Sequence, residues 1–97
     1  MKIEFNKTPE SLTVSLDGRL DTVTAPDLET FFKENLADAS ELIIDCEKLI
    51  YISSAGLRVL LSAQKQLKNP LQLINVGELV NEVLEITGFA DIFKVEK

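Results

Sequence analysis

The apolar run Leu42-Ile43-Ile44, which ends at Asp45, constrains the fold of this chain more than any other feature. A short continuous run of this kind is typical of a central strand that is covered on both faces. Apolar residues at helical spacing precede the run within residues 25–37 and follow it from Ala55 to Leu67. A strand between two amphipathic helices indicates an α/β protein with parallel strands.

The segments outside this centre extend the same pattern. Residues 3–5 and 12–16 alternate apolar and polar side chains, which predicts an antiparallel hairpin whose second strand ends at Gly18. Further along the chain we expect a strand over 71–76, a helix over 79–86 that stops at Gly88, and a closing edge strand or packed tail over 92–95. The sequence therefore predicts one α/β domain over residues 1–97, with a mixed sheet of about four to five strands, an N-terminal antiparallel hairpin, a parallel core and about three to four helices.

The composition disfavours nucleic-acid binding and several kinds of catalysis. A net charge of −6 disfavours nucleic acid as a partner, because phosphate backbones select basic surfaces. The chain has no histidine and a single cysteine, Cys46, which we expect to be a small buried residue; neither a Ser–His nor a Cys–His pair can form. No phosphate-binding glycine motif or metal-ligand spacing occurs. We therefore expect no catalytic residue, no cofactor and no metal.

The same composition predicts a cytoplasmic protein. A lone cysteine cannot form an internal disulfide. The start of the chain, Met1 to Glu4, lacks the apolar segment of a secretion signal, and no stretch reaches the ~20 apolar residues that a membrane span needs.

Parallel strands place the loops at their carboxyl ends on one edge of the sheet, where sites form. We therefore expect the loops at residues 18–24, 46–54 and 75–78 to be neighbours. Thr24, before Ala25-Pro26, is predicted to cap the first helix.

Two serines, Ser53 and Ser54, stand where the second of these loops becomes a helix. Ser54 suits an N-cap, and a plain capping role is the more common one for a serine at a helix start. Ala55 and Gly56 add little bulk, so another molecule could approach the backbone closely. A helix N-terminus also tolerates an added phosphate, which would change the surface without melting the helix.

Other side chains of this edge have alternative roles. Asp21 could orient the serine hydroxyl or accept a hydrogen bond from a partner, and it could equally cap its own loop. Asp45 is expected to satisfy backbone N–H groups, and Tyr51 is expected to contact a partner if exposed. A magnesium cluster of Asp17, Asp21 and Asp45, as in a response-regulator receiver, is disfavoured because no acidic pair follows the first strand.

Three segments together resemble one family, the STAS domains, best known as bacterial anti-sigma factor antagonists. The segments are Asp45 followed by Tyr51-Ile52-Ser53-Ser54-Ala55-Gly56-Leu57, then Gly18-Arg19-Leu20-Asp21 with Ala25, and lastly Val83-Leu84-Glu85-Ile86-Thr87-Gly88-Phe89 with Ile92-Phe93. The resemblance spans nearly the whole chain and implies the STAS mixed sheet.

The resemblance implies a partner-switching role. In that family the unphosphorylated antagonist binds an anti-sigma factor, which is a Ser/Thr kinase of the histidine-kinase-like ATPase type, and so frees the sigma factor. The kinase phosphorylates a serine of the antagonist, which then dissociates, and a PP2C-type phosphatase resets it. Carried onto this chain, the phosphorylated serine is Ser54 and the supporting aspartate is Asp21. The predicted partner-binding residues are Asp21, Tyr51, Ser53, Ser54, Ala55, Gly56, Leu57 and Arg58.

One position departs from the family pattern. Ser53 stands where family members often have an aspartate, which makes Ser53 the second choice as phosphorylation site. The departure also leaves open a STAS subunit that does not switch and instead scaffolds a larger complex, such as an ATP-driven lipid transporter. A small enzyme is the third and weakest alternative.

Overall fold

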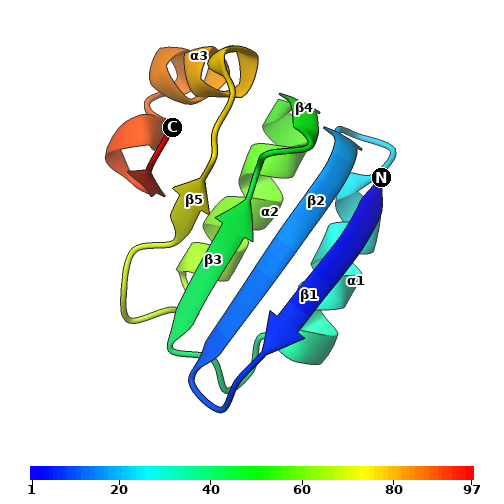
Figure 1. Cartoon of the computed structure of the whole chain (residues 1–97), viewed down its shortest axis with the longest axis vertical. Coiled ribbons are helices and arrows are strands. Elements are labelled where there is room, and N and C mark those ends of the chain that lie inside the picture. The colour runs from blue at the N-terminus through cyan, green and yellow to red at the C-terminus, as the bar shows by residue number, and fades with distance from the viewer.

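Six strands form one mixed sheet in the computed structural model, which describes residues 1–97. The sheet has the order β1-β2-β3-β5-β6, and β4 pairs with the end of β2 beyond β3 (Figure 1). β1 and β2 form the antiparallel hairpin, and all other pairs are parallel. The strands are β1 (Lys2–Lys7), β2 (Ser11–Leu20), β3 (Glu41–Asp45), β4 (Leu49–Ile52), β5 (Gln72–Ile74) and β6 (Lys94–Val95). The predicted fold class is therefore confirmed.

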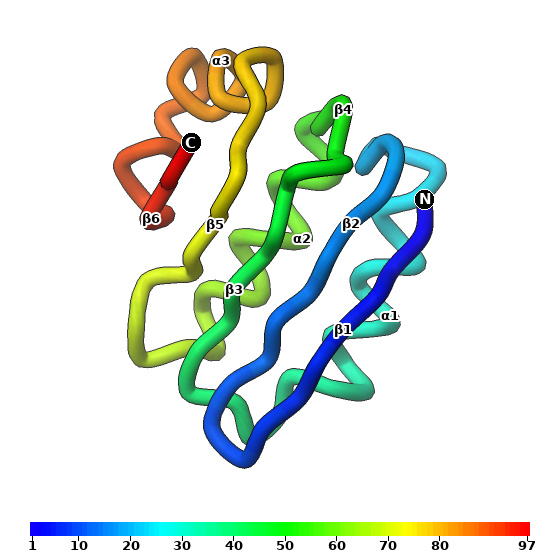
Figure 2. The backbone as a smooth tube through the Cα atoms, viewed as in Figure 1, coloured from blue at the N-terminus to red at the C-terminus, as the bar shows by residue number.

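Three α-helices connect these strands. α1 (Ala25–Asn35) and α2 (Ser54–Gln64) lie behind the sheet, and α3 (Glu78–Thr87) lies beside β4 at one end of the molecule (Figures 1 and 2). A short 3₁₀ helix, η1 (Phe89–Asp91), follows α3. α1 and α2 both end before the predicted boundaries, whereas α3 ends as predicted at Gly88, whose φ of 83° only glycine adopts freely. No helix combines the length and apolar character needed to cross a membrane.

The helices cover only one face of the sheet, so the prediction that β3 is covered on both faces is wrong. Leu42 and Ile44 are each 1% exposed beneath the helices, whereas Ile43 between them is only half-buried on the opposite face. The reason is that α1 and α2 pack on the same side while α3 sits at the end of the sheet. The molecule consequently presents an open sheet face.

The core lies between the covered face and the two helices. The alternating residues Leu12, Val14 and Leu16 of β2 are at most 1% exposed, as the sequence pattern predicts. Leu28 of α1 and Leu60 of α2 are buried in the same cluster. The closing segment is both an edge strand, β6, and a packed tail, since Phe93 is only 4% exposed.

Gly18 does not end β2 as predicted. The strand continues to Leu20, and the register shifts between Gly18 and Arg19. Gly18 has a φ of 113°, and its N–H donates to the Lys48 carbonyl oxygen at 3.0 Å. This irregularity turns the end of β2 from β3 toward β4, a strand that lies within the predicted loop of residues 46–54.

Candidate functional site

The carboxyl ends of β2 and β4 bring the first two predicted loops together. Leu20 pairs with Ile52, and the Ser53 N–H donates to the Leu20 carbonyl oxygen at 2.9 Å. α1 follows β2 after a short turn, and α2 follows β4 after the single residue Ser53. The starts of the two helices therefore lie at one edge of the molecule (Figure 1).

The third predicted loop adjoins the same edge through Asp45. Its carboxylate accepts hydrogen bonds from the Asn75 side-chain amide and from the Glu47 N–H, both at 3.0 Å. Asn75 has a positive φ of 54°, so this hydrogen bond holds a strained loop residue. Asp45 thus has the structural role that was predicted, and the three loops are neighbours.

Ser53, and not Ser54, caps α2. The backbone of Ser53 is extended, with φ −103° and ψ 174°, because its N–H is tied to β2 as a continuation of β4. Its hydroxyl accepts a long hydrogen bond, 3.5 Å, from the Gly56 N–H. The prediction that Ser54 is the N-cap is wrong, since the strand pairing places the extended cap residue one position earlier.

Ser54 is the first residue of α2, and its hydroxyl is free. The side chain is exposed and makes no hydrogen bond within the protein. The first N–H groups of any helix lack intrahelical acceptors, so the backbone around Ser54 offers donors to an anion. A group attached to this hydroxyl would disturb no interaction that holds the fold.

Asp21 supports its own loop. One carboxylate oxygen accepts the N–H groups of Val23 at 3.0 Å and Thr24 at 3.2 Å. These hydrogen bonds, above all the one from Thr24, hold the pKa of Asp21 below its ordinary value. No hydrogen bond joins Asp21 to Ser54. In this structure Asp21 therefore caps its own loop and does not orient the serine hydroxyl.

The first helix starts without a side-chain cap from Thr24, in contrast to the prediction. The Thr24 hydroxyl instead donates to the Arg19 carbonyl oxygen at 2.7 Å and accepts from the Asp21 N–H at 2.9 Å. The Thr24 hydroxyl therefore has both a hydrogen-bond acceptor and a donor within the loop that precedes α1.

Arg19 also belongs to this edge, although it is not among the predicted contact residues. Its side chain pairs with the Asp21 carboxylate at 3.7 Å and lies over the Tyr51 ring, 4.5 Å from the centroid. Arg19 and Tyr51 are cross-strand partners, and the shifted register that aligns them could not be read from the sequence. The contact orients Tyr51, which remains half-exposed and available to a partner.

Two of the predicted contact residues lie in the core. Leu57 is 2% exposed, and Gly56 is buried against β2, where an added Cβ would stand 2.6 Å from the Cγ atom of Leu20. The glycine therefore serves close packing between helix and strand, and the expected approach of another molecule to its backbone does not fit this burial. Neither residue presents a surface that a partner could contact.

Ala55 and Arg58 do reach the surface. Both line a hollow between the start of α2 and the start of α1, with a volume of about 260 Å³. Thr22, Ala25, Pro26, Glu29 and Val59 complete its lining. Asp21, Tyr51, Ser53 and Ser54 are also at least partly exposed, so six of the eight predicted contact residues remain candidates.

Comparison with known proteins identifies the family. The model of the STAS domain matches residues 2–97. The chain belongs to the STAS domain family. It is 36% identical to BtrV of Bordetella bronchiseptica, named among the anti-sigma factor antagonists, over 98% of this chain and 85% of that protein. It is 26% identical to the anti-sigma-B factor antagonist of Staphylococcus aureus over 100% of this chain and 94% of that protein.

Solved structures share the fold of this STAS domain. The crystal structure of an anti-sigma factor antagonist from Mycobacterium paratuberculosis superposes with a TM-score of 0.86 at 24% identity. The match covers 98% of this chain and 84% of that one.

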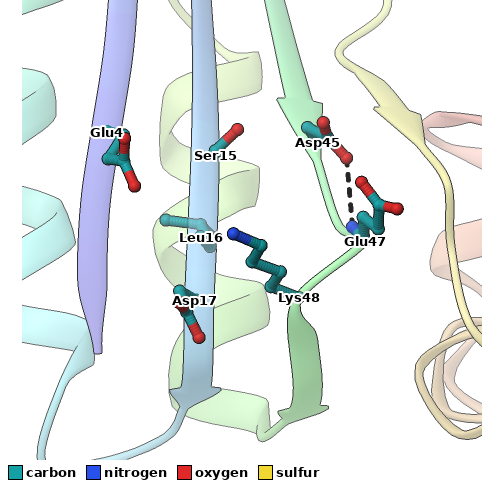
Figure 3. Close-up of a pocket in the computed structure, with 7 residues that line it drawn as sticks. All are labelled: Glu4, Ser15, Leu16, Asp17, Asp45, Glu47 and Lys48. Carbon is teal, nitrogen blue, oxygen red and sulfur yellow. Dashed lines mark hydrogen bonds between the residues drawn. The ribbon is translucent and has the colours of Figure 1, made fainter.

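The open sheet face of the STAS domain carries a separate, mostly acidic hollow of about 190 Å³ (Figure 3). Lys48 reaches into its middle, and the other lining residues are Glu4, Ser15, Leu16, Asp17, Asp45 and Glu47. None of them belongs to the predicted contact surface. No three acidic or cysteine side chains of the chain are grouped closely enough to hold a metal ion.

Cys46 directly follows β3 and is 2% exposed, as predicted for a small buried residue. Burial, with a smaller contribution from the neighbouring Asp45 charge, raises the pKa of the Cys46 thiol to about 12. The thiol therefore stays protonated and unreactive at neutral pH.

Proposed function

We propose that this STAS domain is an anti-sigma factor antagonist whose binding is switched by phosphorylation of Ser54. The unphosphorylated protein binds an anti-sigma factor, a Ser/Thr kinase of the histidine-kinase-like ATPase type, and thereby releases the sigma factor in the cytoplasm. A PP2C-type phosphatase restores the binding form. The chain itself acts as a binding partner and substrate, not as an enzyme. The names of its relatives from Bordetella and Staphylococcus support the antagonist role.

The exposed, unbonded hydroxyl of Ser54 is the observation that carries this proposal. The fold does not use this hydroxyl, unlike the hydroxyls of Ser53 and Thr24. Arg58, one turn further along α2, is also exposed and could contact the same partner. A kinase could therefore reach Ser54 without unfolding the protein.

The switching reaction is a phosphoryl transfer. The Ser54 Oγ atom attacks the γ-phosphorus of ATP, the bond from that phosphorus to the bridging oxygen breaks, and the serine proton passes to a base of the kinase. The products are phosphoserine and ADP. The phosphatase later transfers the phosphoryl group to water, which yields serine and inorganic phosphate.

The energetics favour an off-switch. A phosphoserine brings about −1.5 to −2 charges at neutral pH. A 100-fold loss of affinity requires about 2.7 kcal/mol. Burial of an unmatched charge in an interface costs several kcal/mol. One phosphate is therefore enough to switch off binding if the partner covers Ser54.

Binding of two Ser54 variants to the kinase tests the proposal. In the presence of ATP, Ser54→Ala should remain bound to the kinase that co-purifies with it, whereas Ser54→Asp should bind about 100-fold more weakly. Ser62→Asp is the matched control, because Ser62 is also exposed on α2 but lies two turns away. Isothermal titration calorimetry measures the three affinities.

Equal affinities of Ser54→Ala and Ser54→Asp would refute the switch and favour the scaffold role instead. Equal weakening by Ser54→Asp and Ser62→Asp would also count against it, because general negative charge would then explain the effect.

A further inference from the structure

Arg58 stands one helical turn after Ser54 on the same helix. The two residues are four positions apart in α2, and both are exposed. Residues at this spacing are surface neighbours, with about 5–6 Å between their Cβ atoms. The two side chains are therefore within reach of each other without any change of backbone.

The direction of helical side chains favours this contact. Each Cα–Cβ bond tilts toward the helix N-terminus, so the long Arg58 side chain leans back over the turn that holds Ser54. An acidic group that precedes a basic one by four residues is also the more favourable order on a helix. A phosphate on Ser54 would supply the acidic group in that order.

Arg58 has no acidic partner in the unphosphorylated protein. Glu29 lines the same hollow, but its carboxylate pairs with Lys33 at 3.6 Å. The other arginine of the site, Arg19, pairs with Asp21 at 3.7 Å and lies over Tyr51. Arg58 thus differs from Arg19, because its guanidinium is not held by any carboxylate.

We propose that Arg58 binds the phosphate of phosphorylated Ser54 within the same chain. This inference rests on the proposed phosphorylation of Ser54. The planar guanidinium donates two parallel hydrogen bonds to phosphate oxygens, which a lysine at this position could not do. Phosphorylation then changes the surface twice: it leaves a net negative charge at Ser54, because one guanidinium cannot neutralise a dianion, and it withdraws the Arg58 cation from a partner.

The ionisation of the phosphate reports this contact directly. The protein is made with phosphoserine incorporated at position 54 during translation, so that no kinase is needed. A ³¹P NMR titration then gives the second pKa of the phosphate, which is about 6 in an isolated phosphoserine. An arginine that binds the dianion lowers this pKa, because it favours the charged form.

We expect the phosphate pKa to rise by about half a pH unit in Arg58→Gln relative to the wild type. The reason is that charge-assisted hydrogen bonds are stronger than ordinary side-chain pairs on a helix. Arg58→Lys should give an intermediate value. Lys65→Gln is the matched control, because it removes the same charge from the exposed end of the same helix. This control should leave the pKa within about a tenth of a unit, because the charge lies beyond a Debye length.

Equal phosphate pKa values in the wild type and Arg58→Gln would overturn the inference, as would equal effects of Arg58→Gln and Lys65→Gln. Circular dichroism of the exposed-site variants checks that the fold is retained. The outcome is independent of the kinase. If the Ser54 variants bind the kinase equally but Arg58 lowers the phosphate pKa, only the proposed function is refuted. If the Ser54 variants differ in binding but Arg58 does not lower the phosphate pKa, only the role of Arg58 is refuted.

Discussion

The starts of α1 and α2 lie side by side, carry similar small and hydroxyl residues, and differ in how the fold uses them. Before α1, the Thr24 hydroxyl is engaged with Arg19 and Asp21, and the Asp21 carboxylate accepts two backbone N–H groups. Before α2, Ser53 forms one long capping hydrogen bond and the Ser54 hydroxyl forms none. One edge of the molecule thus holds a turn whose side chains are hydrogen-bonded and a helix start with a hydroxyl, that of Ser54, that forms no hydrogen bond.

The difference separates stability from function. Changes in the Asp21–Thr24 turn should weaken the fold, because they remove hydrogen bonds that satisfy backbone groups. Changes at Ser54 should leave the fold intact and act on binding alone. A domain of this size has a small stability margin, on the order of 5–10 kcal/mol, so a switch residue must carry little of it.

Gly56→Ala should have the largest effect, because it disturbs how α2 is seated on β2. The new Cβ would stand 2.6 Å from the Leu20 Cγ atom and 3.0 Å from the Leu20 carbonyl oxygen. Overpacking of this kind should lower the free energy of unfolding by about 1–3 kcal/mol, measured by urea denaturation. An unchanged midpoint would show that the start of α2 is loosely packed.

Thr24→Val and Ser54→Ala compare the two kinds of hydroxyl directly. Thr24→Val removes a donor and an acceptor from a part-buried turn and should cost about 1–2 kcal/mol of unfolding free energy. Ser54→Ala should change it by less than about 0.5 kcal/mol. Similar losses in both variants would show that the fold depends equally on the two hydroxyls.

Ser53→Ala should have an intermediate effect. It removes the cap of α2, whose hydrogen bond to Gly56 is long at 3.5 Å, and should cost about 0.5–1 kcal/mol in thermal or urea unfolding. A loss as small as that of Ser54→Ala would mean that Ser53 does not act as the cap in solution.

Asp21→Asn should produce a smaller loss of stability than Thr24→Val, and one that depends on pH. The folded-state pKa of Asp21 lies below its ordinary value of 3.8, chiefly because its carboxylate accepts the Thr24 N–H. Its charge therefore stabilises the fold fully above pH 3.8, and that contribution is lost as the pH falls through the folded-state pKa.

The stability advantage of the wild type over Asp21→Asn should consequently shrink when the pH is lowered from about 5 to about 3. Asp38→Asn serves as the control, because Asp38 is exposed and forms no hydrogen bond or ion pair. A difference that stays constant with pH in Asp21→Asn would contradict the role assigned to its charge.

Much of the fold could be predicted because its signals are local. The alternation of Leu12, Val14 and Leu16 identified a strand with one buried face, and Gly88 marked the end of α3. The neighbourhood of the three loops followed from the geometry of parallel strands. These features depend on sequence spacing, which a single chain displays directly.

The missed features depend on pairing between distant segments. The bulge at Gly18 turns β2 toward β4, and this pairing makes Ser53 the cap of α2 instead of Ser54. It also places Arg19 over Tyr51. Gly56 looked accessible because it is small, but its size serves contact with Leu20, which only the packed structure reveals.

Mapping of the phosphorylated residue shows which hydroxyl at the start of α2 is the switch. The wild-type protein is incubated with its kinase and ATP, digested, and analysed by tandem mass spectrometry. The free hydroxyl at the first position of α2 predicts phosphate on Ser54 and none on Ser53, which is engaged as the cap. Phosphate on Ser53, or on neither serine, would rule out Ser54 as the switch residue.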